Sequence, residues 1–214
     1  MRRITKSELQ IIAAITMVLD HLYLIFPSVS ILRIIGRLTF PIFAYCIAEG
    51  CKYSRDKTQY LFRILCCAAA FQLIAGVLTP GYPVSVVWGY AAAVGYTILA
   101  DWSARKEGIT RVLPLAYAFT VSMLLMALKA EYLCLGFLLP LIFTIKKSWL
   151  KWLTAALSLS LLGLMYQYQL WALLALPILM LYNGKKGRLR LGKLLYYFYP
   201  LHYAVLAVIA LILG

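Results

Sequence analysis

Long apolar runs, separated by breaks of only a few residues, constrain this sequence more than any other feature. A helix needs about 20 mainly apolar residues to cross the hydrocarbon core of a bilayer. The runs fill nearly all of the 214 residues, at about 9–26, 32–50, 60–79, 85–102, 112–128, 132–145, 152–166, 169–182 and 194–213. Only 13% of the residues are charged, against about 25% in soluble domains. The pattern excludes a soluble enzyme domain, a large extramembrane module and a disordered regulator.

The fold class follows from how a backbone can be buried in lipid. Every polar backbone group in hydrocarbon must be paired, and a helix pairs its groups within one segment. The runs are continuously apolar and lack the alternation of barrel strands. We therefore predict an all-α, polytopic integral membrane protein of about nine transmembrane helices, with residues 1–214 forming a single helical-bundle domain. One helix over 152–182 would be about 45 Å long, so a hairpin at 166–169 is expected there.

Charge predicts the orientation of the chain. The net charge of +14 would indicate nucleic acid as the partner of a soluble protein, but basic residues mark the cytoplasmic loops of membrane proteins. Alternate breaks, together with the N-terminus, place most cations on one side: Arg2, Arg3, Lys6, Lys52, Arg55, Lys57, Arg105, Lys106, Arg111, Lys146, Lys147, Lys151, Lys185, Lys186, Arg188, Arg190 and Lys193. The opposite loops hold only Lys129. We predict a multi-pass protein of the cytoplasmic membrane, with its N-terminus inside and its C-terminus outside. Its predicted partner is the lipid bilayer, and no nucleic-acid partner is predicted.

Metal chemistry is not predicted. The five cysteines and two histidines form no pair with metal-ligand spacing and no HExxH motif. A nucleophile elbow of the GxSxG type is also absent from the sequence. The cysteines are interpreted as small membrane hydrophobes.

Ionisable residues within the apolar runs are the candidates for function. A charge at the centre of a membrane helix costs about 2.5–3.5 kcal/mol on insertion scales, and such residues usually face the interior of the bundle. Those within or at the edge of the runs are Asp20, His21, Arg33, Arg37, Glu49, Arg63, Asp101 and His202. Asp101 abuts an inner loop and is interpreted as interfacial.

Asp20 and His21 form the first candidate pair. A histidine with a carboxylate nearby is a candidate general base, and the alternative is a structural hydrogen-bonded pair. Neighbours on a helix point about 100° apart, so Asp20 need not touch His21.

A polar stripe follows in the second run, where Arg33, Arg37, Pro41, Tyr45 and Glu49 recur at steps of four. Each step drifts by about 40°, and the stripe extends for about 24 Å. It predicts the polar wall of a path through the bundle. Ion pairs that join helices, such as Arg37 with Asp20, are the alternative, and both can hold.

Two further residues have more than one interpretation. Arg63 could pair with Glu49, reach a lipid phosphate or bind a ligand phosphate. His202 lies about 12 Å into the last run, too deep for an interfacial belt. It is a second base, a ligand contact or a satisfied buried histidine.

Several of these residues also form an ordered set of motifs. They are Asp20-His21, Arg33-x-x-Gly36-Arg37-x-x-Phe40-Pro41-x-Phe43, Glu49-Gly50, Arg63, Tyr182-Asn183-Gly184 and Tyr199-Pro200-Leu201-His202. With these motifs the chain resembles the TraX family, typified by the membrane acetylase that modifies the N-terminus of F-type conjugative pilin. Glu131-Tyr132 stands where the family would have Asp-Tyr. The resemblance implies acetyl transfer from acetyl-CoA within the membrane and kinship with multispan acyltransferases that acetylate sugars, with an unknown acceptor.

Together the residues and the resemblance predict a mechanism. His21 is the general base, held by a carboxylate such as Asp20, and Arg37 orients Asp20 or stabilises the oxyanion. Attack on the thioester is direct, or passes through an acetyl-histidine. The predicted acetyl-CoA site comprises Arg33, Tyr45, Glu49, Lys52, Arg63, Asn183, Tyr199 and His202.

Two other classes of function remain open. A transporter or channel for a small anion or a lipid head group would also carry ionisable residues in its spans. Against it, nine spans do not divide into inverted halves. A membrane scaffold without chemistry would not need the polar stripe.

Overall fold

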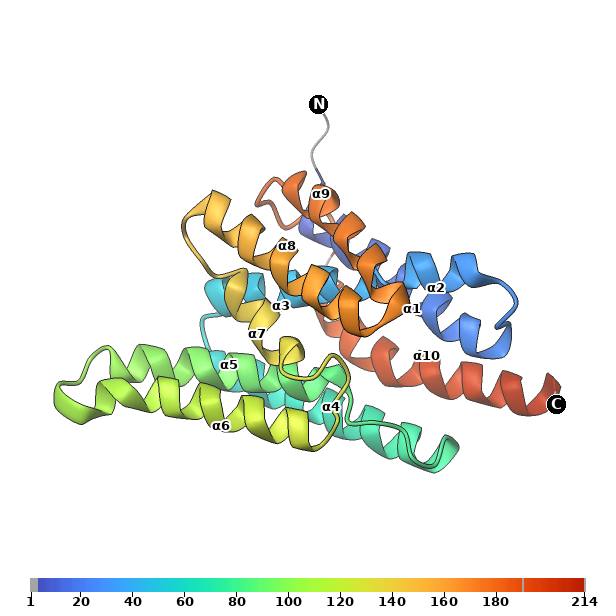
Figure 1. Ribbon diagram of the computed structural model, residues 1–214, viewed down its shortest axis with the longest axis horizontal. Coiled ribbons are helices and arrows are strands. Elements are labelled where there is room, and N and C mark those ends of the chain that lie inside the picture. The colour runs from blue at the N-terminus through green and yellow to red at the C-terminus, as the bar shows by residue number, and fades with distance from the viewer. Residues whose placement is uncertain (1–3, 190, 214) are drawn as a thin grey trace. The chain divides into compact units, whose positions relative to one another are not determined.

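The protein is helical throughout the described residues, which are 4–189 and 191–213 of the computed structural model (Figure 1). This part of the chain contains no β-strand, and its one β-bridge joins Ile4 to Tyr182. The all-α prediction is therefore confirmed. Arg2, Arg3 and Arg190, which contributed to the predicted orientation, lie outside the described residues.

Six helical segments in the described part of the chain are long and apolar enough to cross a membrane. They are Lys6–Ile25, Ser30–Tyr53, Lys57–Leu78, Gly108–Ala127, Ser148–Met165 and Gly192–Ile212. They indicate a membrane protein but do not confirm nine spans. The run predicted at 132–145 contains only α7 (Leu135–Ile142), which is about 12 Å long and too short to cross alone. The orientation and the membrane in which the protein resides stay predictions.

The chain forms two compact units. One contains the described residues up to Cys46 and from Ile145 onwards, and the other contains Ile47–Thr144. The predicted polar stripe begins in the first unit, and Glu49 belongs to the second.

The first unit is built around α1 (Lys6–Ile25), which packs against α2 (Ser30–Gly36) and α10 (Gly192–Leu213). A capping box starts α1, in which Thr5 and Glu8 satisfy each other's backbone N–H groups. Leu9, Ala13 and Met17 line the buried side of α1. Their spacing of four residues keeps them on one face of the helix.

The hairpin predicted at 166–169 is present in this unit. Helix α8 (Ser148–Met165) ends there, and η2 (Gln167–Leu174) turns back and packs against it before α9 (Ala175–Met180). Gly163 makes the turn compact, because a Cβ at this position would lie 2.4 Å from Leu170 Cδ2.

The second predicted span is divided into α2 and α3 (Thr39–Tyr53), with the chain turning at Arg37 and Leu38. Pro41 is the third residue of α3. Its missing N–H falls in the first turn, where no earlier helical carbonyl requires it. Proline therefore fits the start of a new helix rather than the interior of one continuous span.

The second unit is centred on α5 (Val86–Ser103), which packs against α4 (Lys57–Leu78), α6 (Leu113–Ala127) and α7 (Figure 1). A short 3₁₀ helix, η1 (Gly108–Val112), leads into α6. Asp101, near the end of α5, pairs with Lys57 and keeps 54% of its side chain exposed. That exposure agrees with the interfacial interpretation of Asp101.

Glu131 joins two segments of the second unit. Its carboxylate accepts hydrogen bonds from the Tyr82 hydroxyl at 2.8 Å and from the Val86 backbone N–H at 3.0 Å. Val86 is the first residue of α5, so the carboxylate lies at the positive end of that helix. Glu131 thus fixes the entry to the central helix of this unit.

Candidate functional site

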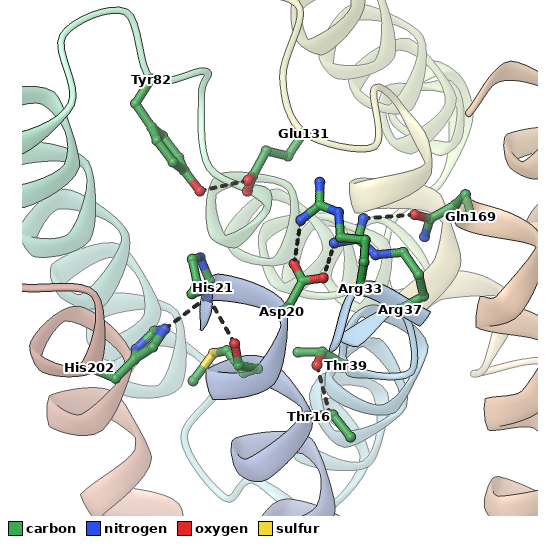
Figure 2. Close-up of polar contacts among 11 residues, drawn as sticks. Thr16, Asp20, His21, Arg33, Arg37, Thr39, Tyr82, Glu131, Gln169 and His202 are labelled. Atoms are coloured by element: carbon green, nitrogen blue, oxygen red, sulfur yellow. Dashed lines mark hydrogen bonds and ion pairs between the residues drawn. The ribbon is translucent and has the colours of Figure 1, made fainter. Parts of the chain in front are cut away.

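A cluster of charged side chains lies in the first unit, between α1, α2 and η2 (Figure 2). Asp20 Oδ2 accepts from Arg33 Nη1 at 3.2 Å, and Asp20 Oδ1 accepts from Arg37 Nη2. The pairing of Arg37 with Asp20 that the sequence suggested is therefore present. Arg37 is only 7% exposed, so its guanidinium is buried, whereas the Asp20 side chain is 15% exposed.

A close approach of α1 and α2 makes the ion pair possible. A Cβ at Gly36 would lie 2.4 Å from Asp20 Oδ1. Glycine at this position leaves the carboxylate room beside the backbone of α2. Arg33 and Arg37, on either side of Gly36 in the sequence, reach the same carboxylate.

Gln169 completes the cluster. Arg37 Nη1 donates to Gln169 Oε1 at 3.1 Å, and the Gln169 side chain is among the most buried polar groups of the described residues. Its oxygen faces the guanidinium, which fixes the orientation of the amide. Sequence reasoning misses Gln169, because residues 166–169 indicate only a hairpin turn.

His21 points away from Asp20 toward a different partner (Figure 2). Its Nδ1 lies 3.0 Å from the Met17 carbonyl oxygen and 3.2 Å from His202 Nε2. His202 Nδ1 in turn lies 3.1 Å from the Phe198 carbonyl oxygen. The carboxylate of Asp20 is engaged by the two arginines instead, because successive residues of α1 point in different directions.

Aromatic rings hold the two imidazoles in place. His202 is 6% exposed, and its ring stacks on Phe198 with a centroid separation of 5.5 Å. The Tyr203 ring lies edge-on to His21, with a centroid separation of 5.3 Å. Tyr199, a predicted acetyl-CoA residue, lies edge-on to His202 and to Phe43.

Tyr45, another predicted acetyl-CoA residue, lies in a second aromatic group of this unit. Its ring is parallel to Trp152, with a centroid separation of 6.2 Å, and lies edge-on to Tyr182 at 5.6 Å. Lys151 Nζ lies 4.7 Å from the centroid of Trp152. The ammonium group is close enough for a cation–π interaction.

Asn183 shapes the basic loop that follows Tyr182. Its side-chain oxygen accepts from Lys185 N at 2.8 Å, and its backbone N–H donates to Ile4 O at 3.0 Å. Gly187 adopts a φ of +83°, and a Cβ there would lie 2.0 Å from Ser7 Oγ. The loop is therefore held against the start of α1.

Glu49, Lys52 and Arg63 lie in the second unit. Glu49 is 8% exposed, Lys52 Nζ lies 5.0 Å from the centroid of Tyr53, and Arg63 donates to Gln59 Oε1 at 2.5 Å. Their predicted contacts with acetyl-CoA stay predictions. Among the described residues there is no cluster of three or more His, Cys, Asp or Glu side chains that could hold a metal ion.

Comparisons with known proteins complement this geometry. Residues 5–210 match the family described as TraX protein. A relative named probable fimbrial assembly protein FimC, serogroup H1, from Dichelobacter nodosus is 28% identical over 233 aligned residues, which cover 93% of each chain. No solved structure matches the chain.

Proposed function

This chain belongs to the TraX family, and on that premise we propose that it is a membrane acyltransferase that uses acetyl-CoA. The family and the relative named for fimbrial assembly point to a pilin-related membrane function. The proposed reaction moves an acetyl group to an amine or hydroxyl of an acceptor. A pilin-like N-terminal amine or a sugar hydroxyl would have the required chemistry.

The observation that carries the proposal is the charged cluster of Asp20, Arg33 and the buried Arg37, in which Asp20 directly precedes His21 on α1. Two guanidinium groups share one carboxylate, which leaves one positive charge in excess inside an apolar bundle. Attack on a thioester places negative charge on its carbonyl oxygen. Fixed positive groups in a poorly solvated site stabilise such a charge well. Arg37 and Arg33 are thus suited to stabilise the negatively charged carbonyl oxygen of the thioester, the oxyanion.

His21 supplies the base. The acceptor atom attacks the thioester carbon as its proton passes to His21, and the carbon–sulfur bond then breaks. The proton on His21 goes to the departing CoA thiolate, so atoms and charge balance. A general base typically contributes about 10²–10⁴-fold to the rate, which gives the cost expected when the imidazole is removed.

The remaining assignments concern acetyl-CoA. We place its pantetheine arm along Arg33 and Tyr45 of the first unit. Asn183 supports this site through its hold on the basic loop containing Lys185 and Lys186. Tyr199 contributes its ring beside His202. The N-terminus-inside orientation would let acetyl-CoA enter from the cytoplasm.

A purified-protein assay tests the proposal. The full chain in detergent is mixed with acetyl-CoA and either a peptide with a free N-terminal amine, the same peptide with a blocked amine, or a sugar. We expect thiol release together with acetylation of an unblocked acceptor. His21→Ala should lower turnover at least about 100-fold while gel-filtration elution and thermal midpoint stay native. Normal turnover by this variant would remove His21 from the mechanism.

A substitution at Gln169 tests the role of the excess positive charge in the cluster. Gln169→Glu would place a second carboxylate against Arg37, so the cluster would become neutral. We expect kcat to fall by about 10²-fold with little loss of thermal stability. Gln169→Met, which removes the hydrogen bond without adding charge, is the matched control. Equal activity of the two variants would contradict the electrostatic role.

A further inference from the structure

His21 and His202 form a chain of hydrogen bonds whose direction can be deduced. Four groups lie in order: the Phe198 carbonyl, the His202 ring, the His21 ring and the Met17 carbonyl. The distances are 3.1 Å from Phe198 O to His202 Nδ1, 3.2 Å from His202 Nε2 to His21 Nδ1, and 3.0 Å from His21 Nδ1 to Met17 O.

The two carbonyls decide where the protons are. A carbonyl oxygen can only accept, so the Nδ1 that faces it must carry the hydrogen in both rings. A neutral imidazole has one donor and one acceptor nitrogen, which makes His202 Nε2 an acceptor. It faces the Nδ1–H of His21, which is shared between His202 and Met17 O. The opposite arrangement would set the lone pair of His21 Nδ1 against the carbonyl oxygen of Met17.

From this geometry we infer that His202 is a positioning residue: together with the Met17 carbonyl, its Nε2 accepts from Nδ1–H of His21, holds His21 in the Nδ1–H tautomer and so makes His21 Nε2 the basic atom of the site. The inference rests on the proposed function for its catalytic meaning. The tautomer itself follows from the hydrogen bonds alone, because the bond made at one ring nitrogen sets the protonation of the other.

The consequence for proton transfer is direct. When His21 Nε2 takes a proton from the acceptor, the ring becomes an imidazolium and its Nδ1–H becomes a stronger donor. His202 Nε2 is already in place to accept it, as the buried aspartate does in a Ser-His-Asp triad. Hydrogen bonds from a charged donor are roughly twice as strong as neutral ones. His202 therefore stabilises the protonated state that forms during transfer.

A neutral partner suits this environment. A carboxylate at position 202 would bring another charge into a membrane helix, which is costly in hydrocarbon. Asp20, which directly precedes His21 on α1, is already engaged by Arg33 and Arg37. Packing by Phe198, Tyr199 and Tyr203 holds the rings in the required orientation.

Nitrogen NMR tests the tautomer without any substrate. The chain contains two histidines, so ¹⁵N-histidine labelling of the full protein in detergent gives four ring signals, which His202→Gln assigns. The spectrum is recorded at alkaline pH, where imidazoles are neutral. We expect a protonated Nδ1 and an unprotonated Nε2 in both rings. A proton on Nε2 of His21 would overturn the inference.

Kinetics of two variants test the positioning role. His202→Phe keeps a ring but cannot accept a hydrogen bond, whereas His202→Gln presents an amide oxygen to His21. We expect the Phe variant to lose kcat on the order of 10²-fold, with KM for acetyl-CoA nearly unchanged, and the Gln variant to retain most of kcat. Equal loss in both, or an effect confined to KM, would overturn the role. Absence of turnover in the native chain would instead refute the proposed function and leave the NMR result standing.

Discussion

At the scale of single residues, adjacent positions serve different networks. Asp20 faces Arg33 and Arg37, while His21 faces Met17 and His202. A residue step of about 100° around the helix separates the two side chains. Asp20 and His21 therefore belong to two separate networks that begin at the same turn of α1.

Burial predicts that substitutions of Asp20 and of Arg33 lower the stability of the protein by unequal amounts. Asp20→Asn would leave Arg37, whose side chain is 9% exposed, and Arg33 without their negative partner. Removing one partner of a buried pair costs about 3–5 kcal/mol. We expect a clear drop in the unfolding midpoint of this variant, measured in detergent.

Arg33→Gln is the matched variant for that measurement. The Arg33 side chain is 28% exposed, and the carboxylate keeps Arg37. A partly exposed ion pair is worth less than a buried one, so the midpoint should fall less than it does for Asp20→Asn. A larger loss for Arg33→Gln than for Asp20→Asn would contradict the burial argument.

At the scale of elements, glycine and proline set where helices meet and where they start. Gly36 lets α2 approach Asp20 on α1, Gly163 lets η2 fold against α8, and Pro41 lies in the first turn of α3. The hairpin was predictable from helix length. The break between α2 and α3 was not, because both halves of the stripe carry one continuous apolar pattern.

Gly36→Ala tests whether the approach of α1 and α2 supports the site. The added Cβ would lie 2.4 Å from Asp20 Oδ1, which forces the carboxylate or the helix to move. We expect lower acetyl-transfer activity and a lower thermal midpoint. The assay compares initial rates of thiol release with those of the native chain.

Gly76→Ala provides the control on α4, where a Cβ would meet nothing within 4 Å. Alanine stabilises the interior of a helix by about 0.8–1.0 kcal/mol relative to glycine. This variant should be neutral or slightly more stable. Equal behaviour of the two alanine variants would show that the α1–α2 contact is not needed.

At the scale of the whole molecule, topology is the property that charge and hydropathy predict together. Six helices in the described residues meet the length and hydropathy expected of spans, and α5, with 18 residues, is about 27 Å long. Seven or nine crossings would put the two termini on opposite sides, whereas six would put them on the same side.

Reporter fusions measure whether the number of membrane crossings is odd or even. We expect a reporter fused after residue 214 to be active only outside the cytoplasm, and one inserted in the basic loop at 52–57 to be active only inside, as the positive-inside rule requires. A C-terminal reporter active in the cytoplasm would indicate an even number of crossings and contradict the predicted orientation.

The sequence by itself determined the helical class, the hairpin after α8 and the short list of ionisable residues, because hydropathy and chain length act locally. It also suggested the pairing of Asp20 with Arg37. Only the tertiary structure decided that His21 meets His202, 181 residues away, and that Gln169 meets Arg37, 132 residues away. Such partners depend on which helices pack together and on the rotation of each helix about its axis. Local sequence patterns carry neither.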